Sequence, residues 1–399
     1  VCITYGGTMI FVDKPYISDL FRQTILDNSF PVVKTEMARE LGFHDEPYFL
    51  DEDEAIKLAR SSKDIRIYTT SENSIGWIAQ HLSFTDLPEK IDLFKNKAKF
   101  RKMISPMYPD FYFQEVTLGD LDSLDIEEIP LPFVIKPAVG FFSMAVYKVA
   151  HPGQWEGIKE SIKVEIQRVQ HLYPQEVMNT STFIIEQCIV GDEFAIDAYY
   201  DAAGEPVILN IYNHIFSSDT DVSDRVYISS KEIIESNIDE FREFLGRVGE
   251  LSGVKNFPMH VEIRRDGSGI LLPIEINPMR FGGWCTTADL TCFAYGFNPY
   301  KYYFSQKRPD WPAVLKDKDG KLYSIIVLDN STGVDGDRIT SFDYDTLLSR
   351  FEHPLDFRRI DYKQYPVFGF LFTETQKDRF SELEAILSSD LKEFISAKV

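Results

Sequence analysis

The apolar positions in residues 1–95 follow short helical and strand patterns in alternation. One helix face is formed by Ile17, Leu20, Phe21 and Ile25. Ser74 precedes a second helical pattern and is expected to cap it. The apolar runs at 31–33 and 65–68 are typical of buried strands. Strands that alternate with helices predict a small parallel α/β domain.

Strand patterns dominate the middle of the chain, with helical spacing at 155–169 and 241–251. Residues 131–149 are expected to form a strand, a loop and a second strand, with Pro137 ending the first strand. Further strand patterns lie at 182–190, 193–201, 206–216, 259–265 and 269–278. The last two flank Asp266-Gly267-Ser268-Gly269, which predicts a β-hairpin.

The last hundred residues continue with strand patterns at 321–329 and 366–372. Thr375 and Asp378 fit a capping box, which predicts that a helix begins near Thr375. Its buried face is expected to contain Phe380, Leu383, Leu387, Leu391 and Phe394. This segment therefore predicts a closing α+β subdomain.

Composition excludes several functions. The chain has 399 residues and a formal net charge of −21, which disfavours binding to nucleic acid or to an anionic membrane. No apolar stretch is long enough to span a membrane, and the N-terminus lacks a basic leader. The four cysteines (Cys2, Cys188, Cys285 and Cys292) form no CxxC pair. We therefore expect a cytoplasmic protein.

Polar residues alternate along the predicted hairpin 259–280. His260, Glu262 and Arg264 share one face of the first strand, and Glu275 and Asn277 share one face of the second. If the two faces coincide, two carboxylates and an amide oxygen converge as hard ligands suited to Mg²⁺. The alternative is a solvated hairpin. The apolar neighbours of Glu275 favour the metal site, because buried acids seldom lack a partner.

Two further patterns are suited to nucleotide binding. Lys136 interrupts an apolar strand before a loop of small residues, an arrangement that binds phosphate. Glu186 ends a strand and Glu193 follows a turn, so one carboxylate could lie near an adenine amino group and the other near ribose. The backbone of 187–189 could read the adenine edge. Taken alone, Lys136 fits a snorkelling edge-strand lysine and Glu186 fits an exposed strand end.

Together and in this order, the three patterns resemble the ATP-grasp superfamily over residues 95–300. The resemblance implies an α/β protein whose parts differ in architecture. They are a Rossmann-like pre-ATP-grasp domain (1–95), a two-lobed α+β ATP-grasp domain (96–300) and a small C-terminal α+β subdomain (301–399).

The resemblance also implies roles for individual residues. The first nucleotide lysine is Lys97 or its rival Lys99, and Lys136 is the second and acts in catalysis. Residues 138–145 form the phosphate-covering loop, although it contains Gly140 alone and has Ala145 where many relatives have glycine. The nucleotide contacts are Lys97, Lys136, Gly140, Ser143, Glu186, Gln187, Ile189 and Glu193.

The remaining implied roles concern the metal and the transferred group. Glu262, Glu275 and Asn277 are the metal ligands, and Arg280 is the catalytic group that stabilises transferred phosphate. Substrate contacts are expected at His260, Arg264, Gly282 and Gly283. His214 is expected to be a hydrogen-bonded strand residue.

The resemblance implies an enzyme that uses ATP and Mg²⁺, with Mn²⁺ as an alternative. The favoured reaction forms an acyl phosphate, releases ADP and joins the acyl group to an amine, such as that of an amino acid or small peptide. The alternatives are a kinase that phosphorylates a hydroxyl or a carboxylate, and a nucleotide-binding protein without turnover. The expected partners are small molecules, with a homo-oligomer as a further option and no nucleic acid or membrane.

Overall fold

A four-stranded parallel sheet forms the first unit of the computed structural model, which describes residues 7–43, 48–140, 145–169, 179–218 and 223–398. Its strand order is β3-β2-β1-β4. The strands are β1 (Thr8–Phe11), β2 (Val32–Val33), β3 (Phe49–Leu50) and β4 (Arg66–Thr69). The helices are α1 (Asp19–Asn28), α2 (Glu36–Glu40), α3 (Glu52–Ser61) and α4 (Ile75–His81). The predicted parallel α/β arrangement is confirmed.

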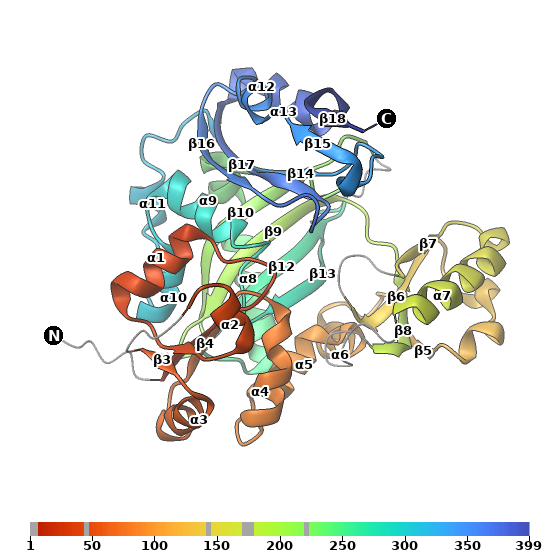
Figure 1. Ribbon diagram of the computed structural model, residues 1–399. Helices are drawn as coiled ribbons and strands as arrows, with labels where there is room; N and C mark the ends of the chain where they lie inside the picture. The colour runs from red at the N-terminus through yellow and green to blue at the C-terminus, as the bar shows by residue number, and fades with distance from the viewer. Residues whose placement is uncertain (1–6, 44–47, 141–144, 170–178, 219–222, 399) are drawn as a thin grey trace.

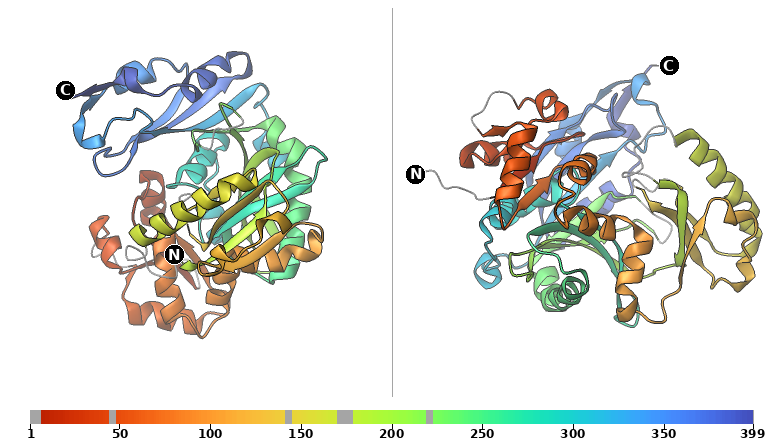
Figure 2. Two further views of the ribbon diagram at one scale, coloured as in Figure 1. Left: turned by 90° about the vertical axis from the view of Figure 1, so that its right-hand side faces the viewer. Right: turned by 90° about the horizontal axis from the view of Figure 1, so that it is seen from below.

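Two helices, α5 (Leu87–Lys95) and α6 (Lys97–Ile104), lead to a four-stranded antiparallel sheet of order β5-β8-β6-β7. Its strands are β5 (Phe113–Thr117), β6 (Phe133–Val139), β7 (Tyr147–Val149) and β8 (Asn179–Gln187). Helix α7 (Trp155–Val169) packs on it, and Trp155 contacts Phe133 edge to face. Figures 1 and 2 show this sheet and α7 as a lobe beside the central sheet.

An eight-stranded antiparallel sheet forms the centre of the molecule, in the order β13-β12-β9-β10-β11-β14-β17-β16. Its first five strands in the chain are β9 (Asp192–Tyr200), β10 (Pro206–Ile215), β11 (Val226–Ser230), β12 (Phe257–Arg265) and β13 (Leu271–Pro278). The other three are β14 (Lys321–Asp329), β16 (Pro354–Arg359) and β17 (Val367–Gln376). Hydrogen bonding thus continues across residue 300, where the sequence predicts a domain boundary.

Helices cover both faces of this central sheet. Helix α8 (Lys231–Ser252) packs its apolar side on one face, where Phe241 contacts Phe194 at 5.4 Å between ring centroids. On the other face lies α9 (Thr286–Tyr295). The Tyr212 hydroxyl donates to the carbonyl oxygen of Thr287 and forms a hydrogen bond with the hydroxyl of Thr291. Helices α10 (Pro299–Ser305) and α11 (Trp311–Val314) follow. The face that carries Tyr212 is the polar face of the sheet.

The C-terminal segment adds a small two-stranded sheet of β15 (Ile339–Phe342) and β18 (Ile395–Ala397), with helices α12 (Tyr344–Leu348) and α13 (Ser381–Leu387). The predicted helix start at Thr375 is wrong. Thr375 lies in β17, where it pairs with Leu322 of β14, and its hydroxyl donates to the Glu382 carboxylate. Helix α13 also ends at Leu387, and Leu391 has a left-handed backbone.

Two local predictions in the earlier units are also wrong. Ser74 does precede α4, but its hydroxyl donates to Asp13 at 2.6 Å instead of capping the helix. Pro137 does not end its strand, since β6 continues to Val139. A strand tolerates proline where its missing N–H faces no partner. Among the described residues, none of the helices is long and apolar enough to cross a membrane.

Candidate functional site

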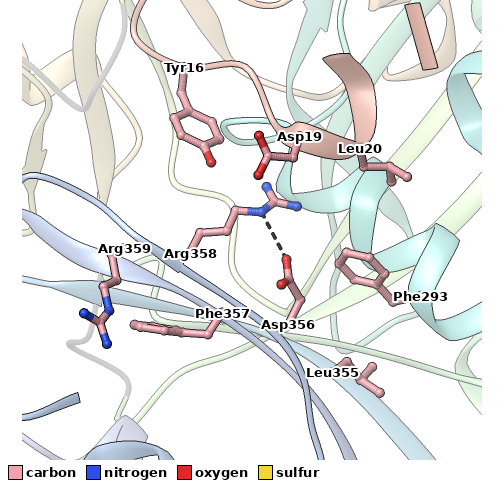
Figure 3. Close-up of a pocket in the computed structure, with 9 residues that line it drawn as sticks. All are labelled: Tyr16, Asp19, Leu20, Phe293, Leu355, Asp356, Phe357, Arg358 and Arg359. Atoms are coloured by element: carbon pink, nitrogen blue, oxygen red, sulfur yellow. Dashed lines mark ion pairs between the residues drawn. The ribbon is translucent and has the colours of Figure 1, made fainter. Parts of the chain in front are cut away.

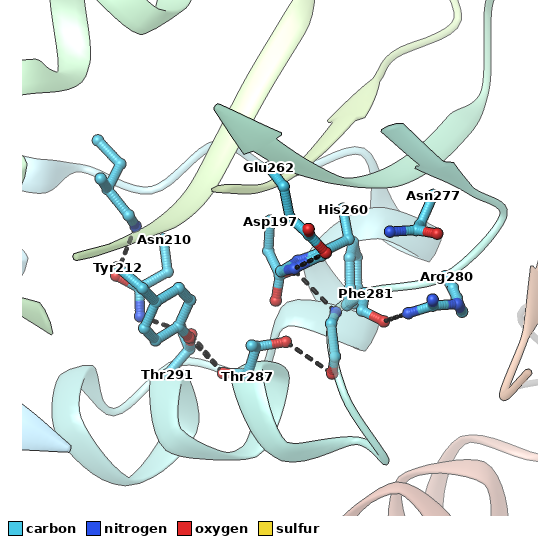
Figure 4. A network of polar contacts seen from close by, with 12 residues as sticks. Asp197, Asn210, Tyr212, His260, Glu262, Asn277, Arg280, Phe281, Thr287 and Thr291 are labelled. Carbon is cyan, nitrogen blue, oxygen red and sulfur yellow. Dashed lines mark hydrogen bonds and ion pairs between the residues drawn. The ribbon is translucent and has the colours of Figure 1, made fainter. Parts of the chain in front are cut away.

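The hairpin β12–β13 brings its two polar faces together, which the alternation alone left open, and a one-residue bulge in β13 sets their register. Glu262 lies opposite Glu275, and His260 lies opposite Asn277. The Asn277 amide donates to Glu275 at 3.0 Å. Figure 4 shows Glu262, His260 and Asn277 beside Arg280. Two carboxylates and an amide therefore share one end of the polar face.

The two facing glutamates have opposite pKa shifts. Burial alone would raise the pKa of Glu275, but the ammonium groups of Lys97 and Lys136 outweigh it and hold that pKa well below its ordinary value. Burial and the Glu275 charge raise the pKa of Glu262 well above its ordinary value. A divalent cation between them would remove this repulsion, so the donor set fits Mg²⁺. Within the described ranges, no group of three or more His, Cys, Asp and Glu residues suits a metal, and this set has only two acids.

The two candidate lysines lie at the junction of α5 and α6 and have different surroundings. Lys97 Nζ lies 3.1 Å from Glu275 and 3.4 Å from the Gly140 carbonyl oxygen, so it joins the hairpin to the end of β6. Lys99 is half exposed and pairs with Asp92. Asn96 caps α6 by accepting from the N–H groups of residues 98 and 99, which fixes this orientation. The structure therefore places Lys97 beside the hairpin and Lys99 at the surface, and which of them is the first nucleotide lysine stays a prediction.

A buried ion cluster that the sequence did not predict links the N-terminal unit to Arg280. Glu72, just after β4, pairs with Lys95, and its other oxygen lies 3.4 Å from Arg280 Nη2. Burial opposes ionisation of Glu72, but Lys95 and Arg280 outweigh it and lower the Glu72 pKa. The position of Glu72 beyond the carboxyl end of a parallel strand is the signal that could have indicated it.

Glu186 is almost fully buried between two cations. Its carboxylate oxygens lie 2.5 Å from Lys136 Nζ and 2.7 Å from Arg101 Nε. Burial opposes ionisation, yet Arg101 and Lys136 lower the pKa of Glu186 to about 2. Burial lowers the pKa of Lys136. The structure therefore brings Lys136 and Glu186 together, with Arg101 as a partner that sequence analysis missed.

The predicted adenine-reading backbone already has partners in the protein. The N–H of Gln187 donates to the carbonyl oxygen of Tyr112 at 3.0 Å. The carbonyl oxygen of Ile189 accepts from Arg264 Nη1 at 2.5 Å. The roles of these two residues as nucleotide contacts stay predictions.

Glu193 lies at the centre of a second polar group. It accepts from His214 Nδ1 at 3.0 Å and from Arg264 Nε at 2.9 Å. His214 also contacts the Ser223 carbonyl and stacks on Tyr227, so the expected hydrogen-bonded strand role is confirmed. Arg264 lies beside the predicted nucleotide contacts, and its role as a substrate contact stays a prediction.

His260 is held in place by Asp197, a fully buried residue of β9. Asp197 Oδ1 accepts from Gly282 N at 3.0 Å and lies 2.8 Å from His260 Nδ1. A Cβ on Gly282 would come within 2.4 Å of the His260 ring, and Gly283 has a φ of +59°. The glycine pair therefore has a steric reason, while contact with a substrate stays a prediction for both.

The predicted phosphate-covering loop is described at its ends alone. Gly140 follows β6, and Ala145 is buried with its N–H donating to Glu165 at 3.1 Å. Ala145 has a φ of +52°, a conformation that favours glycine. Residues 141–144, which include the predicted contact Ser143, lie outside the described residues.

The low pKa of Glu186 predicts a pH-dependent stability. The folded pKa lies at about 2 and the ordinary value is 4.5, so the stabilisation is complete above pH 4.5 and is lost as pH falls towards 2. This shift corresponds to about 3 kcal/mol. We expect Glu186→Gln to lower the free energy of unfolding by that order at pH 7 and by progressively less towards pH 3, as measured by urea unfolding.

A neighbouring acid provides the control. Glu115 on β5 is exposed and pairs with Lys102, so Glu115→Gln is expected to change the free energy of unfolding by less than about 1 kcal/mol at either pH. If Glu186→Gln matched Glu115→Gln at pH 7, the buried ion triad would not stabilise the fold as described.

The ATP-grasp domain family model matches residues 129–288. Similar solved structures include an L-amino acid ligase from Bacillus licheniformis (18% identity, TM-score 0.68, 98% of each chain). Another is the N5-carboxyaminoimidazole ribonucleotide synthetase from Thermotoga maritima (14% identity, TM-score 0.63, 98% of this chain and 99% of that one).

A biotin carboxylase from Campylobacter jejuni, in its beta-gamma-ATP complex, is also similar (12% identity, TM-score 0.60, 98% of this chain and 92% of that one). No curated protein matches the sequence. At these identities the structural likeness shows the fold. The family model shows that residues 129–288 form an ATP-grasp domain.

Proposed function

We propose that the protein is an ATP-dependent ligase that activates a carboxylate as an acyl phosphate and joins it to the amine of an amino acid or small peptide. The observation that carries this proposal is the convergence of Lys97, the Glu262–Glu275 pair and Arg280 at one end of the polar face. Positive groups gathered beside two carboxylates suit a phosphoryl group that moves between oxygens. The similarity to an L-amino acid ligase agrees with this substrate class.

The metal requirement follows from the same residues. Glu262, Glu275 and Asn277 would hold Mg²⁺, with Mn²⁺ as an alternative. When bound, the ion would neutralise the charge on the nucleotide phosphates. Lys97 Nζ pairs with one carboxylate oxygen of Glu275, so the same ammonium group would also contact a nucleotide phosphate bound beside that oxygen.

In the proposed reaction, a substrate carboxylate oxygen attacks the γ-phosphorus of ATP, and ADP leaves. The amine nitrogen then attacks the acyl carbon, phosphate leaves, and the nitrogen releases a proton. Lys97 and Lys136 orient the phosphates, and Arg280 holds the oxygens of the transferred phosphoryl group. Glu72 fixes the Arg280 guanidinium, which leaves less rotational freedom to be lost when the substrate binds.

Phosphoryl transfer to a hydroxyl is the alternative, because the same cationic groups would serve a kinase. The products distinguish the two. A ligase releases ADP, phosphate and an amide, whereas a kinase leaves the phosphate on its acceptor. We expect small-molecule substrates and a cytoplasmic location, and the oligomeric state stays a prediction.

The test is a screen of paired amino acids and other carboxylates with Mg²⁺-ATP, in which nucleotides and phosphate are separated by chromatography. We expect ADP and phosphate in equal amounts with at least one productive pair. AMP and pyrophosphate from a productive pair would contradict the acyl-phosphate route.

The two candidate lysines give a matched pair of variants. We expect Lys97→Met to raise the KM for ATP by about 10- to 100-fold, since a charge-assisted hydrogen bond contributes roughly 1.5–3 kcal/mol. Lys99→Met removes an exposed ion pair with Asp92 and is expected to change the KM by less than about twofold. Steady-state kinetics with varied ATP measures both, and a larger effect at Lys99 would reverse the assignment.

A further inference from the structure

A cavity of about 450 Å³ lies where α1, α9 and β16 meet. Figure 3 shows its lining side chains. None of the described residues that line it belongs to the proposed nucleotide contacts, metal ligands or substrate contacts. The cavity therefore has chemistry that the proposed function does not use.

Arg358 of β16 is the central polar group of the cavity and is itself 7% exposed. Its Nη2 pairs with Asp289 of α9, and its Nε lies 3.5 Å from Asp356. The third nitrogen, Nη1, is buried and has no hydrogen-bond partner within the described part of the chain. An unpaired buried guanidinium N–H is costly, and a carboxylate ligand would satisfy it.

Two more polar groups converge on this guanidinium. The Tyr16 hydroxyl and the Asp19 carboxylate point towards Arg358 (Figure 3), and neither makes a hydrogen bond or ion pair with another described residue. Burial raises the pKa of Tyr16, so its phenol keeps its proton and can donate. Asp19 is exposed at the start of α1 and supplies a negative charge at the mouth.

The remaining lining residues comprise an apolar side and two charged residues, Asp356 and Arg359. Leu20, Phe293 and Leu355 line the cavity on the side of α9 (Figure 3), and Leu355 is 37% exposed at its rim. A cationic donor, an acid at the mouth and an apolar side of the wall match the three parts of an α-amino acid with an apolar side chain.

We propose that this cavity binds a small apolar α-amino acid. The ligand carboxylate accepts from Arg358 Nη1 and the Tyr16 hydroxyl, its ammonium group pairs with Asp19, and its side chain packs on Leu20, Phe293 and Leu355. The proposal does not rest on the proposed ligase function, because none of these groups belongs to the catalytic set.

The test measures the binding of L-leucine to the full chain without nucleotide, by isothermal titration calorimetry or saturation-transfer NMR. We expect saturable binding by the wild-type protein. Binding of 4-methylpentanoate and 3-methylbutylamine, which lack the ammonium group and the carboxylate respectively, is expected to be at least about tenfold weaker. Since ATP is absent, a failed ligase assay would leave this result unaffected.

Two variants locate the site without breaking the Arg358–Asp289 pair. Leu355→Trp fills the rim, and Asp19→Asn removes the mouth charge. We expect each to weaken leucine binding by at least about tenfold. The controls are Leu131→Trp, a similarly exposed leucine outside the cavity, and Asp27→Asn at the other end of α1, and both are expected to bind as wild type does.

Three outcomes would overturn the proposal. The first is absence of saturable leucine binding to wild type. The second is equal binding by wild type, Leu355→Trp and Asp19→Asn, which would place leucine elsewhere. The third is equal binding of leucine and the two truncated analogues, which would mean that the cavity recognises apolar shape alone.

Discussion

Glu275→Gln is expected to lower kcat by about 10³-fold or more, because loss of a hard anionic ligand removes several kcal/mol of phosphate stabilisation. The fold should survive. The change removes the attraction between Glu275 and Lys97, whose atoms lie 3.1 Å apart, but it also removes the repulsion between Glu275 and Glu262. We expect Glu262→Gln to have a similar but milder effect, since that carboxyl holds its proton more tightly.

Glu374→Gln is the matched control. Glu374 lies on β17 of the same sheet and forms the same kind of pair with Lys321, at 2.9 Å, but no catalytic role is assigned to it. Turnover of this variant is expected to stay within about twofold of wild type. Steady-state kinetics measures the turnover of both variants, and circular dichroism checks that both are folded. Near-normal turnover by Glu275→Gln would contradict the metal-site assignment.

Arg280→Met is expected to lower kcat/KM for the carboxylate by about 10²- to 10³-fold, since a positioned donor that stabilises developing charge contributes roughly that much. The KM for ATP should change far less, because the nucleotide lysines remain. Loss of Arg280 also leaves Glu72 with Lys95 as its partner, so the buried acid keeps a counter-charge. Arg280→Lys should recover part of the rate, but not the two parallel bonds of a guanidinium.

Arg308→Met controls for the loss of an arginine. Arg308 is exposed and pairs with Asp201, and its removal is expected to leave kcat/KM unchanged. Kinetics with the carboxylate and ATP varied separately give the two effects. An equal rise in both KM values for Arg280→Met, with kcat intact, would indicate a binding role without transition-state stabilisation.

The polar face of the hairpin could be predicted because it depends on local rules. Alternation put Glu262 and His260 on one side of their strand. The register from the turn extends to the Ile263–Pro273 pair, and one extra residue in β13 before Glu275 then sets Glu262 opposite Glu275, a shift that the sequence does not display. The Glu72–Arg280 contact could not be predicted in this way. These residues are 208 positions apart, and their contact depends on how β4 docks beside Met279, whose carbonyl oxygen accepts from Thr69.

Errors arose where pairing overrode a local signal. The predicted capping box at Thr375 does not form, because Thr375 belongs to β17, which pairs along its length with residues Lys321 to Asp329 of β14. Ser74 does not cap α4, because its hydroxyl donates to the buried carboxylate of Asp13, which would otherwise lack this donor. In both cases a side-chain motif competed with long-range hydrogen bonds, which the sequence does not display.

Hydroxylamine trapping tests the proposed reaction through its intermediate. The wild-type protein is incubated with Mg²⁺-ATP, a productive carboxylate and hydroxylamine in place of the amine, and ADP and hydroxamate are quantified. An acyl-phosphate ligase forms hydroxamate and ADP in equal amounts, and Glu275→Gln forms neither. ADP without hydroxamate, together with a stable phosphorylated alcohol, would contradict the ligase function and establish the kinase.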